Sequence, residues 1–592
     1  MKRPIAVDFE TSYTKDRSIG THGTFNYLSH PDTKIFMVAI YGEGLSYVGD
    51  PEGAPWDQVR GNLVVAHNYT FEHAVLRECE RRGIIKEPLN ETGFCTADMS
   101  AYLQAPRNLL GAARELLGVS LDKTTRDKFK GKDFETLPID LKLEIGNYAL
   151  MDAKACFHLY QRYHHLWPEH EQKLSEHTRL MGRRGINLDI EKLDQGIRHY
   201  KEVLWGLEKL IPWAGEEKLL SPVALKNACR KAGIPAPEST AKNEESFQVW
   251  ADEYSSKVPF VAAVSKYRSV NRSLEVLEAM KTRLDGERMQ YGLKYCGAVP
   301  TFRWAGDSGL NCQNMPRNEV EGVNIRHMLV PAPGKKFISA DMSQIEPRVS
   351  LYLTGDKDQL DLIRNGMCVY EAHGRQTLGY DLPISMKAAA KTDDKYNDLR
   401  QFCKARILGL NYGQYARGFQ AYAKTFGINL TLEKARQQVE QFKKANPKLA
   451  KFWEQLEQGA KFSNNEDYEI ELPSGRSMKY FNMRVTRGKY GAEFHAKPVR
   501  GEAMNYFNFG KWHNHCCQGT GRDVLGEAIL RIENELGLPI VLHVHDEVLV
   551  EVDEADAKDA QVAVAKAMAT SPDWMPGIPL TSDCKIFDRY EK

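Results

Sequence analysis

Acidic residues in two distant segments are the first candidates for chemistry. The segment VLHVHDEVLVEV, residues 541–552, alternates apolar and polar residues around a turn that holds His545, Asp546 and Glu547. Adjacent carboxylates on a rigid turn repel each other, and a divalent cation relieves that repulsion. A solvated hairpin turn can carry the same residues, so this segment alone does not decide between the two interpretations.

The second segment is KKFISADMSQIEPRVSLYLTGD, residues 335–356, in which an apolar strand ends at Asp341 and a helix follows. A carboxylate at a strand end that faces a carboxylate on a hairpin turn can hold two Mg²⁺ ions across a phosphoryl group during its transfer. We therefore predict that Asp341 and Asp546 lie close together, with Glu547 as a supporting acid.

The motif D-x-S-Q-I-E-x-R at Asp341, followed far downstream by V-H-D-E at Asp546, resembles motifs A and C of the family A, DNA polymerase I-like enzymes. This resemblance implies a right-hand polymerase with an antiparallel palm sheet and helical thumb and fingers. Asp341 and Asp546 are then the metal ligands. His545 is expected beside the primer terminus.

The stretch DLRQFCKARILGLNYGQ, residues 398–414, predicts a helix with Arg400, Lys404, Leu408 and Tyr412 along one stripe. The two cations suit a triphosphate, and the apolar and aromatic residues suit a base and a sugar. The stretch resembles motif B, with Leu408 in place of the usual Phe or Tyr. An amphipathic surface helix fits this mixture poorly.

Other residues of the nucleotide pocket follow from the resemblance. Glu346 is expected to exclude a 2′-hydroxyl, which favours DNA synthesis, because single-subunit RNA polymerases have a small residue there and lack an exonuclease. Gln344 is expected in the same pocket. Tyr370, in MCVYEAHG, stands where the family has a phosphate-binding His, so we predict weaker nucleotide binding there.

The resemblance also implies contacts to primer–template DNA. The segment 301–333 matches the family at Arg303 but departs from it at Phe302 and Trp304. Donors that face the minor groove can test the shape of a base pair without reading its sequence. The residues expected to contact DNA are Arg303, Gln313, Asn314, Arg476, Asn514, Gln518 and His545.

A second set of acids lies near the start of the chain. The strand PIAVDFET puts Asp8 and Glu10 on one face. Glu72 follows the next strand on a helical run, and Tyr148 and Asp152 are four residues apart on a later helix. Each of these patterns alone is unremarkable and also occurs on polar surfaces.

Together they resemble the Exo I, II and III motifs of DnaQ-like 3′–5′ exonucleases, which have an RNase H-like fold of a mixed sheet with helices. The resemblance implies that Asp8, Glu10 and Asp152 hold metal ions and that Tyr148 positions the attacking water. Glu72 replaces the usual Asp. Glutamate keeps the charge and adds a methylene, so we expect an active but retuned exonuclease.

The chain is therefore expected to be an α/β multidomain protein, with an exonuclease domain in residues 1–172 and a polymerase domain in 173–592. Basic thumb residues such as Lys242, Lys266 and Arg268 are candidates for phosphate contacts, although solvated helices carry the same residues. The expected polymerase subdivisions are thumb about 190–290, palm about 291–360 and 500–592, and fingers about 361–499.

Bulk properties limit the alternatives. The 592 residues carry 80 basic and 79 acidic side chains, so a nucleic-acid surface must come from local clustering. The eleven cysteines include no C-x-x-C pair, which favours reduced thiols and a cytoplasmic location.

Cys516 and Cys517 could join His513 and His515 at a zinc site, but adjacent residues of a helix point in different directions. No apolar run is long enough to span a bilayer, and MKRPIAVDFET leaves no room for a targeting peptide.

These expectations converge on a DNA-directed DNA polymerase of a phage or bacterium, with a proofreading 3′–5′ exonuclease and no 5′ nuclease. Two Mg²⁺ ions per active site are expected, replaceable by Mn²⁺, and Lys404 is a candidate to protonate pyrophosphate. Primer–template DNA and dNTPs are the expected partners of a monomer, with a helicase or single-strand-binding protein as further candidates. The alternatives are a nuclease-dominated enzyme with weak synthesis and a non-catalytic primer–template binding protein.

Overall fold

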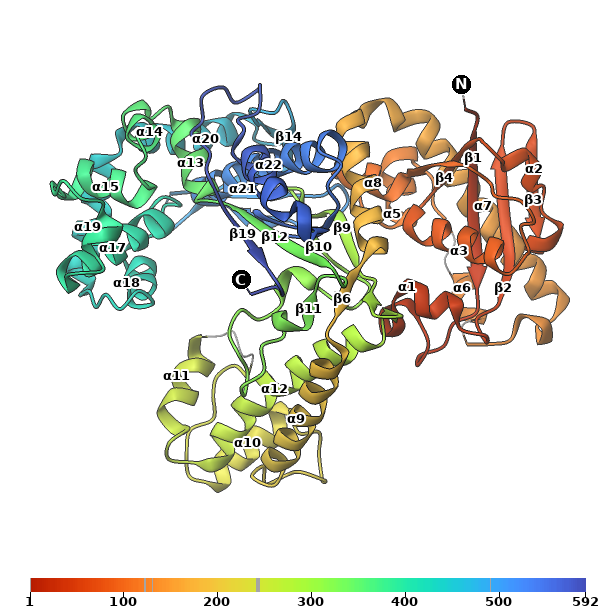
Figure 1. Ribbon diagram of the computed structural model, residues 1–592, viewed down its shortest axis with the longest axis horizontal. Helices are drawn as coiled ribbons and strands as arrows, with labels where there is room; N and C mark the ends of the chain where they lie inside the picture. Colours follow the sequence, from red (N-terminus) through yellow and green to blue (C-terminus); the bar gives the residue numbers. More distant parts are fainter. Residues whose placement is uncertain (1, 122–123, 130, 241–244, 490, 592) are drawn as a thin grey trace.

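A mixed five-stranded sheet forms the centre of the amino-terminal lobe, on the right of Figure 1. The computed structural model describes residues 2–121, 124–129, 131–240, 245–489 and 491–591. The strand order is β3-β2-β1-β4-β5, with β1 antiparallel to β2 and parallel to β4. The strands are β1 (Pro4–Thr11), β2 (Ile35–Gly42), β3 (Leu45–Gly49), β4 (Leu63–Ala66) and β5 (Thr92–Cys95).

The long helix α7 (Ile139–Tyr163) packs against β1 and β2. Ile145, Ala149 and Ala153 recur every four residues on its buried face, and the small alanines allow the helix to approach the sheet closely. The same packing turns Asp152 toward the sheet. The other helices of this lobe are α1 (Ile19–Ser29), α2 (Trp56–Val59), α3 (Tyr69–Arg81), α4 (Thr96–Tyr102), α5 (Leu109–Ala112) and α6 (Thr124–Phe129).

A helical arm projects downward in Figure 1 from a small sheet of order β11-β6-β8-β7. Its first helix begins at an N-cap, where the Asp189 carboxylate accepts a hydrogen bond from the Lys192 amide over 3.1 Å. The helices are α9 (Ile190–Glu208), α10 (Pro222–Lys231), α11 (Glu245–Tyr254) and α12 (Pro259–Lys281). The strands at its root are β6 (Ile186–Leu188), β7 (Leu284–Asp285), β8 (Arg288–Met289) and β11 (Leu329–Val330).

The centre of the molecule holds an antiparallel sheet of order β17-β18-β12-β19. Strands β17 and β18 are buried along almost their whole length, whereas β19, at one edge of the sheet, alternates half-buried and exposed residues over most of its length. The strands are β12 (Lys335–Met342), β17 (Ile540–Val544), β18 (Glu547–Asp553) and β19 (Ser582–Phe587). Nearby are the pair β9 (Gly292–Ala298) and β10 (Arg303–Asp307), and the helices α21 (Phe509–Leu530) and α22 (Ala557–Ala569).

The remaining lobe, on the left of Figure 1, is mainly helical. A further sheet, of order β13-β14-β15-β16, follows it along the chain. The helices are α13 (Ile345–Thr354), α14 (Lys357–Arg364), α15 (Val369–Leu378), α16 (Met386–Ala389), α17 (Asp394–Ala405), α18 (Ala416–Lys424), α19 (Leu432–Ala445) and α20 (Pro447–Phe462). The strands are β13 (Tyr468–Glu471), β14 (Ser477–Gly488), β15 (Gly491–Lys497) and β16 (Asn505–Phe507).

The amino-terminal lobe is joined to the rest of the chain by shared packing. Helix α8 (Glu169–Arg184) runs through the predicted domain boundary at residue 172. Just before it, the Trp167 ring lies 5.2 Å from that of Phe94 and 5.9 Å from that of Tyr295. One buried apolar cluster therefore extends from the amino-terminal sheet into the central body.

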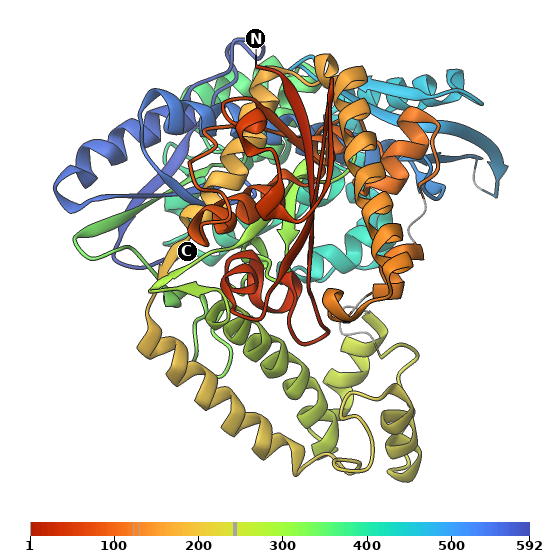
Figure 2. The same ribbon diagram turned by 90° about the vertical axis from the view of Figure 1, so that its right-hand side faces the viewer.

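A buried glutamine, Gln104, adds a polar connection between the same parts. Figure 2 shows the molecule from the side of the amino-terminal lobe, which lies in front of the central body. The Gln104 side-chain amide donates to the carbonyl oxygens of Lys479 over 2.8 Å and Pro498 over 2.9 Å. Its side-chain oxygen accepts from the Lys479 amide over 2.7 Å. This residue thereby attaches β14 and the end of β15 to the amino-terminal lobe.

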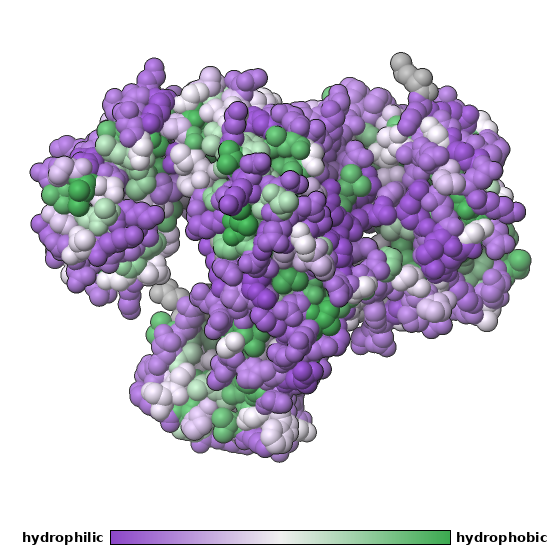
Figure 3. All heavy atoms as spheres, in the orientation of Figure 1, coloured by the Kyte–Doolittle hydropathy of each residue, from purple (hydrophilic) through white to green (hydrophobic). Residues whose placement is uncertain are grey.

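The face of the molecule drawn in Figure 3 is mostly hydrophilic, with small scattered hydrophobic areas. None of the helices in the described part of the chain has the length and apolar character needed to cross a membrane.

Candidate active sites

The central sheet brings Asp341 and Asp546 together. In the register of β12 and β18, Asp341 lies opposite Glu547, and Asp546 occupies the turn before that strand. The Met342 amide donates to the Asp546 carbonyl over 3.0 Å, which fixes the turn against the end of β12. The predicted hairpin and the predicted proximity of the two acids are confirmed, whereas their catalytic roles remain predictions.

The electrostatics of this pair suit a cation. Burial, followed by repulsion from Asp341, raises the pKa of Asp546 to about 6. A divalent cation between the carboxylates would remove that repulsion. Across the described residues, no group of three or more His, Cys, Asp or Glu side chains is arranged to hold a metal ion. Oxygens of a bound phosphate would therefore have to complete the coordination of an ion held by two carboxylates.

Glu547 is buried and held by two hydroxyl groups. Ser339 donates to one carboxylate oxygen over 2.5 Å, and the Tyr590 hydroxyl donates to the other over 3.1 Å. The carboxylate thus anchors the hairpin to β12 and to the end of the chain. Nothing in the sequence pattern predicted Ser339 and Tyr590 as its partners, because hydrogen bonds between distant residues leave no local signal.

Glu346 lies at the start of α13 and has two partners. The Arg303 guanidinium forms an ion pair with it, and the Tyr412 hydroxyl donates to its carboxylate over 3.0 Å. The side chain of Gln344 accepts from the first amide of α15, at Val369, over 2.9 Å. Arg303, which was predicted to contact DNA, therefore lies together with Glu346 and Tyr412, which were predicted for the nucleotide pocket.

The predicted helix over 398–414 differs from the observed one. Helix α17 ends at Ala405, and a π-helical turn follows over Arg406–Leu410. A π turn inserts one residue, so the four-residue period that placed Leu408 and Tyr412 in line with Arg400 changes at this point. Local periodicity does not reveal such an insertion.

Arg400, Lys404 and Tyr370 remain neighbours despite this change. The Arg400 guanidinium lies 5.9 Å from the centroid of the Tyr370 ring. Burial, followed by repulsion from Arg400, lowers the pKa of Lys404. Two cations beside a phenol form a polar corner that would suit phosphate oxygens.

The residues expected to contact DNA are in different environments. Arg476 is buried, where its guanidinium contacts the Asp523 carboxylate over 3.0 Å and the Gly519 carbonyl over 3.0 Å. Gln313 is also buried, and its amide donates to the His543 carbonyl over 3.4 Å. Asn314 and His545 are exposed, while Asn514 and Gln518 are half-buried on one face of α21.

Two of the basic residues predicted to contact DNA from the helical arm have protein partners. Lys266 forms an ion pair with Glu321 over 2.7 Å. Arg268 donates to the Thr240 carbonyl over 2.7 Å and lies 4.7 Å from the centroid of the Phe247 ring. Lys242 lies outside the described residues.

The acids of the amino-terminal lobe converge from three elements. Asp8 and Glu10 point from β1, Glu72 from the first turn of α3, and Tyr148 and Asp152 from α7. Burial, followed by the charges of Asp152, Glu10 and Asp8, raises the pKa of Tyr148. Burial also raises the pKa of Glu72 well above its usual value, and Glu10 adds to the effect. Glu72 and Asp152 are buried, and Asp8 and Glu10 are half-buried. Repulsion within such a cluster of like charges favours a cation on physical grounds, although no three of these described side chains are arranged to hold a metal ion.

Comparison with known proteins identifies the family. The sequence model of DNA polymerase family A matches residues 207–592, which is more than half of the chain. The chain belongs to DNA polymerase family A.

Three relatives illustrate the extent of the similarity. The chain is 24% identical to the DNA polymerase of Bacillus phage SP02 over 100% of both chains. It is 26% identical to DNA polymerase I of Pseudomonas aeruginosa, over 69% of this chain and 44% of that protein. Its fold resembles a structure described as "POL domain of Pol1 from M. smegmatis complex with DNA primer-template and dNTP", with a TM-score of 0.68, 17% identity and coverage of 100% of this chain and 96% of the other.

Proposed function

We propose that this family A protein extends the 3′-hydroxyl of a DNA primer with dNTPs under direction of a template, and that it removes 3′-terminal nucleotides in a separate site. The observation that carries the synthetic activity is the juxtaposition of Asp341 and Asp546 at the end of the central sheet. Family membership and the phage relative support it. In this proposal α9–α12 form the thumb, the sheet around Asp546 forms the palm, and α14–α19 form the fingers.

Asp341 and Asp546 would hold two Mg²⁺ ions, which when bound supply charge neutralisation for phosphoryl transfer. The chain orients both partners of the reaction. The hairpin turn keeps Asp546 against β12, and Glu547 fixes that turn through Ser339 and Tyr590. Arg400 and Lys404 bind the triphosphate, and Lys404 gives a proton to the departing pyrophosphate.

Glu346 restricts the sugar. Arg303 and Tyr412 hold its carboxylate in place, so the group has little freedom to move away from a 2′-hydroxyl.

The single-stranded and duplex parts of DNA then contact exposed or half-buried residues such as Asn314, Asn514, Gln518 and His545. We infer that the buried Arg476 acts on DNA indirectly, by holding the loop before β14 against α21.

The exonuclease site would use Asp8, Glu10 and Asp152 as metal ligands, with Tyr148 orienting the attacking water. The strand order of the amino-terminal sheet is compatible with an RNase H-like domain. Glu72 replaces the Asp that is usual in the second exonuclease motif. Its buried position suggests that it keeps a proton until a cation enters the site.

A primer-extension assay with wild type and Asp546→Ala tests the synthetic activity. Asp553→Ala is a matched control, because Asp553 lies at the far end of the strand that follows Asp546 and has 66% of its side chain exposed. Wild type and the control should extend a primer only when dNTPs are present, and Asp546→Ala should not. Primer shortening without extension in wild type would favour a nuclease-dominated enzyme, and primer binding without either reaction would favour a non-catalytic protein.

The exonuclease is tested with a mismatched 3′ end and Mg²⁺ in the absence of dNTPs. Wild type should remove the mismatched nucleotide, whereas Asp8→Ala should leave it in place and retain extension of a matched primer. A mismatched end that survives in wild type would rule out the proofreading activity. Sedimentation of the purified protein would test the expected monomer.

A further inference from the structure

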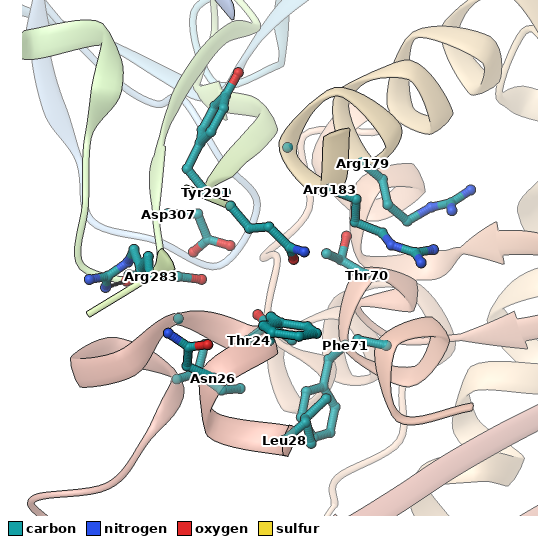
Figure 4. Close-up of a pocket in the computed structure, with 18 of the residues that line it drawn as sticks. Thr24, Asn26, Leu28, Thr70, Phe71, Arg179, Arg183, Arg283, Tyr291 and Asp307 are labelled. Atoms are coloured by element: carbon teal, nitrogen blue, oxygen red, sulfur yellow. Dashed lines mark hydrogen bonds between the residues drawn. The ribbon is translucent and has the colours of Figure 1, made fainter. Parts of the chain in front are cut away.

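A cavity of about 300 Å³ lies where the amino-terminal lobe meets the central body (Figure 4). Helices α1 and α3 form one side, and α8, β9 and β10 form the other. Among the described lining residues there are five arginines and three carboxylates. A wall with this excess of positive charge favours an anionic ligand over a neutral or cationic one.

Two of these arginines, one turn apart on α8, are at most weakly paired with a carboxylate. In the described part of the chain, no Asp or Glu oxygen lies within 4 Å of the Arg183 guanidinium, which instead donates to Nδ1 of His73 over 2.8 Å. The Arg179 guanidinium lies 5.0 Å from the centroid of the Tyr69 ring, and its nearest carboxylate is 3.6 Å away on Glu176. Their charges are therefore weakly neutralised by the protein.

The other arginines of α3 are already paired. Arg77 contacts Glu80 and Glu91, each over 2.8 Å, and Arg81 contacts Glu78 over 2.6 Å. The two arginines of α3 that line the cavity thus have close carboxylate partners, whereas Arg179 and Arg183 on α8 do not. The fifth arginine, Arg283, donates to the backbone carbonyls of Gly20, Ala279 and Ser308. The α8 pair therefore has the most unused binding capacity among the arginines that line the cavity.

His73 cannot supply the missing counter-charge. Burial, followed by the charges of the neighbouring arginines, lowers its pKa to about 3, so the imidazole is neutral near pH 7. It accepts a hydrogen bond from Arg183 and leaves the other guanidinium N–H groups of that residue available. Burial and the charges of Arg179 and Arg77 also lower the pKa of Arg183, a cost that a bound anion would offset.

The start of α3 adds to the same positive region. Asn68 and Thr70 line the cavity, and Asn68 makes no side-chain cap for the helix. The Phe71 amide donates to the Asn68 carbonyl over 2.8 Å, so this helix start contributes the positive end of the helix dipole rather than a set of free amides. Figure 4 shows Arg179 and Arg183 projecting side by side from α8, with Thr70 below Arg183.

We propose that this cavity binds a phosphate group of a nucleotide, with Arg179 and Arg183 as its ligands. Paired guanidinium groups match the oxygens of a phosphate, and a volume near 300 Å³ is within the range of about 300–1,000 Å³ for small-ligand sites. Two sources share this chemistry: a phosphodiester of a DNA strand and a free nucleotide. Only the DNA source rests on the proposed function, because Glu72 lies two residues after Thr70 on α3.

Binding is measured with the full chain in excess EDTA, so that no cleavage or synthesis is needed. The probes are dTMP, followed by calorimetry, and a 5′-labelled single-stranded oligodeoxythymidine, followed by fluorescence anisotropy. The variant is Arg179→Gln combined with Arg183→Gln. Lys173→Gln is the matched control, because Lys173 is a cation on the same helix with 53% of its side chain exposed and Glu169 as its partner.

The double variant should weaken binding about tenfold or more, while Lys173→Gln should change it less than twofold. If the double variant loses affinity for the oligonucleotide alone, the site binds a phosphodiester of DNA. If it also loses affinity for dTMP, the site binds a free nucleotide. Unchanged binding of both probes would overturn the proposal. Arg183→Lys should lose less affinity than Arg183→Gln, and an equal loss would also overturn it by indicating a packing role.

Failure of the proposed function is a separate result. Wild-type protein could bind these probes through Arg179 and Arg183 and still not cleave a mismatched 3′ end. That result would support the anion site and reject only the exonuclease assignment. Conversely, if the double variant binds both probes as wild type does and wild type cleaves a mismatched 3′ end, the anion-site proposal is wrong and the exonuclease assignment stands.

Discussion

Glu346 illustrates how one side chain can control substrate choice. We expect Glu346→Ala to raise the incorporation of ribonucleotides relative to deoxyribonucleotides by about ten- to hundredfold, because the carboxylate no longer excludes the 2′-hydroxyl. Single-nucleotide extension with rATP and dATP measures the ratio. Glu346→Gln keeps the size of the side chain, so it should stay close to wild type if steric exclusion is the cause. A ratio that is unchanged in Glu346→Ala would contradict this role.

Tyr370 offers a second test at the residue scale. The Tyr370 ring lies beside the Arg400 guanidinium. An imidazole at this position, protonated or neutral, can donate a hydrogen bond to a phosphate oxygen. Tyr370→His should therefore lower the KM for dNTPs several-fold, as measured by steady-state extension. Tyr396→His is a suitable control, because that ring packs against Tyr380 at 5.9 Å. If both variants kept the wild-type KM, the departure at Tyr370 would have no effect on nucleotide binding.

The sequence identified Asp341, Asp546 and Glu346 because each belongs to a local motif of fixed spacing. It did not identify the partners that hold them, such as Ser339 and Tyr590 for Glu547. It also gave no indication that Arg476 is buried against Asp523. These contacts join residues that are far apart along the chain, and only the folded structure brings them together.

At the scale of elements, the contact between α21 and the end of the motif B segment is unusually close. A Cβ atom on Gly510 would lie 2.1 Å from the Tyr412 carbonyl oxygen, and backbone atoms cannot move aside as a flexible side chain can. Gly510→Ala should lower the free energy of unfolding by about 1–3 kcal/mol, because this junction becomes overpacked. Urea unfolding followed by circular dichroism measures the change.

Gly206→Ala is the control for that substitution. Gly206 lies in α9 with no heavy atom within 4 Å of the added Cβ. Alanine should there raise the free energy of unfolding by up to about 1 kcal/mol, since it favours the helix. A destabilisation as large as that of Gly510→Ala would show that the cost does not come from the Tyr412 contact.

Strands with strong alternation and helices with clear periodicity were predictable at this scale. The hairpin around Asp546 and the strand that ends near Asp341 were both expected from pattern alone. The π turn at Arg406–Leu410 was not, because the inserted residue changes the period without changing the composition.

The whole molecule contains several buried histidines that should make its stability sensitive to acid. Burial lowers the pKa of His513 and His515 to about 4 and that of His543 to about 3. Unfolded histidine takes up a proton near pH 6.5, so the unfolded chain binds more protons than the folded chain below that value. The free energy of unfolding should therefore fall by several kcal/mol, to order of magnitude, as the pH falls from about 6.5 to 4.

His543→Phe tests this pH dependence. Both ring nitrogens of His543 are without a hydrogen-bond partner in the described part of the molecule, so Phe removes the titration with little loss of polar contacts. The difference between unfolding free energies at pH 7.5 and pH 5 should become smaller in His543→Phe. His158→Gln, at an exposed position, should keep the wild-type difference. An equal pH dependence in all three proteins would contradict the prediction.

The arrangement of the lobes could not be predicted from the sequence. Motif order indicated an amino-terminal unit and a larger following unit, but gave no sign that Gln104 would bond to Lys479 and Pro498. Packing of Trp167 between Phe94 and Tyr295 was equally hidden. Such junctions depend on complementary surfaces that are formed only after each lobe has folded.

The shared packing around Trp167 has a practical consequence for anyone who wishes to engineer this protein. A shortened version beginning near residue 173 would leave Tyr295 and the backbone groups now bonded to Gln104 facing water. Such a fragment would be prone to aggregate. A version that keeps every residue and inactivates one lobe by a single substitution is the sounder starting point for a laboratory reagent.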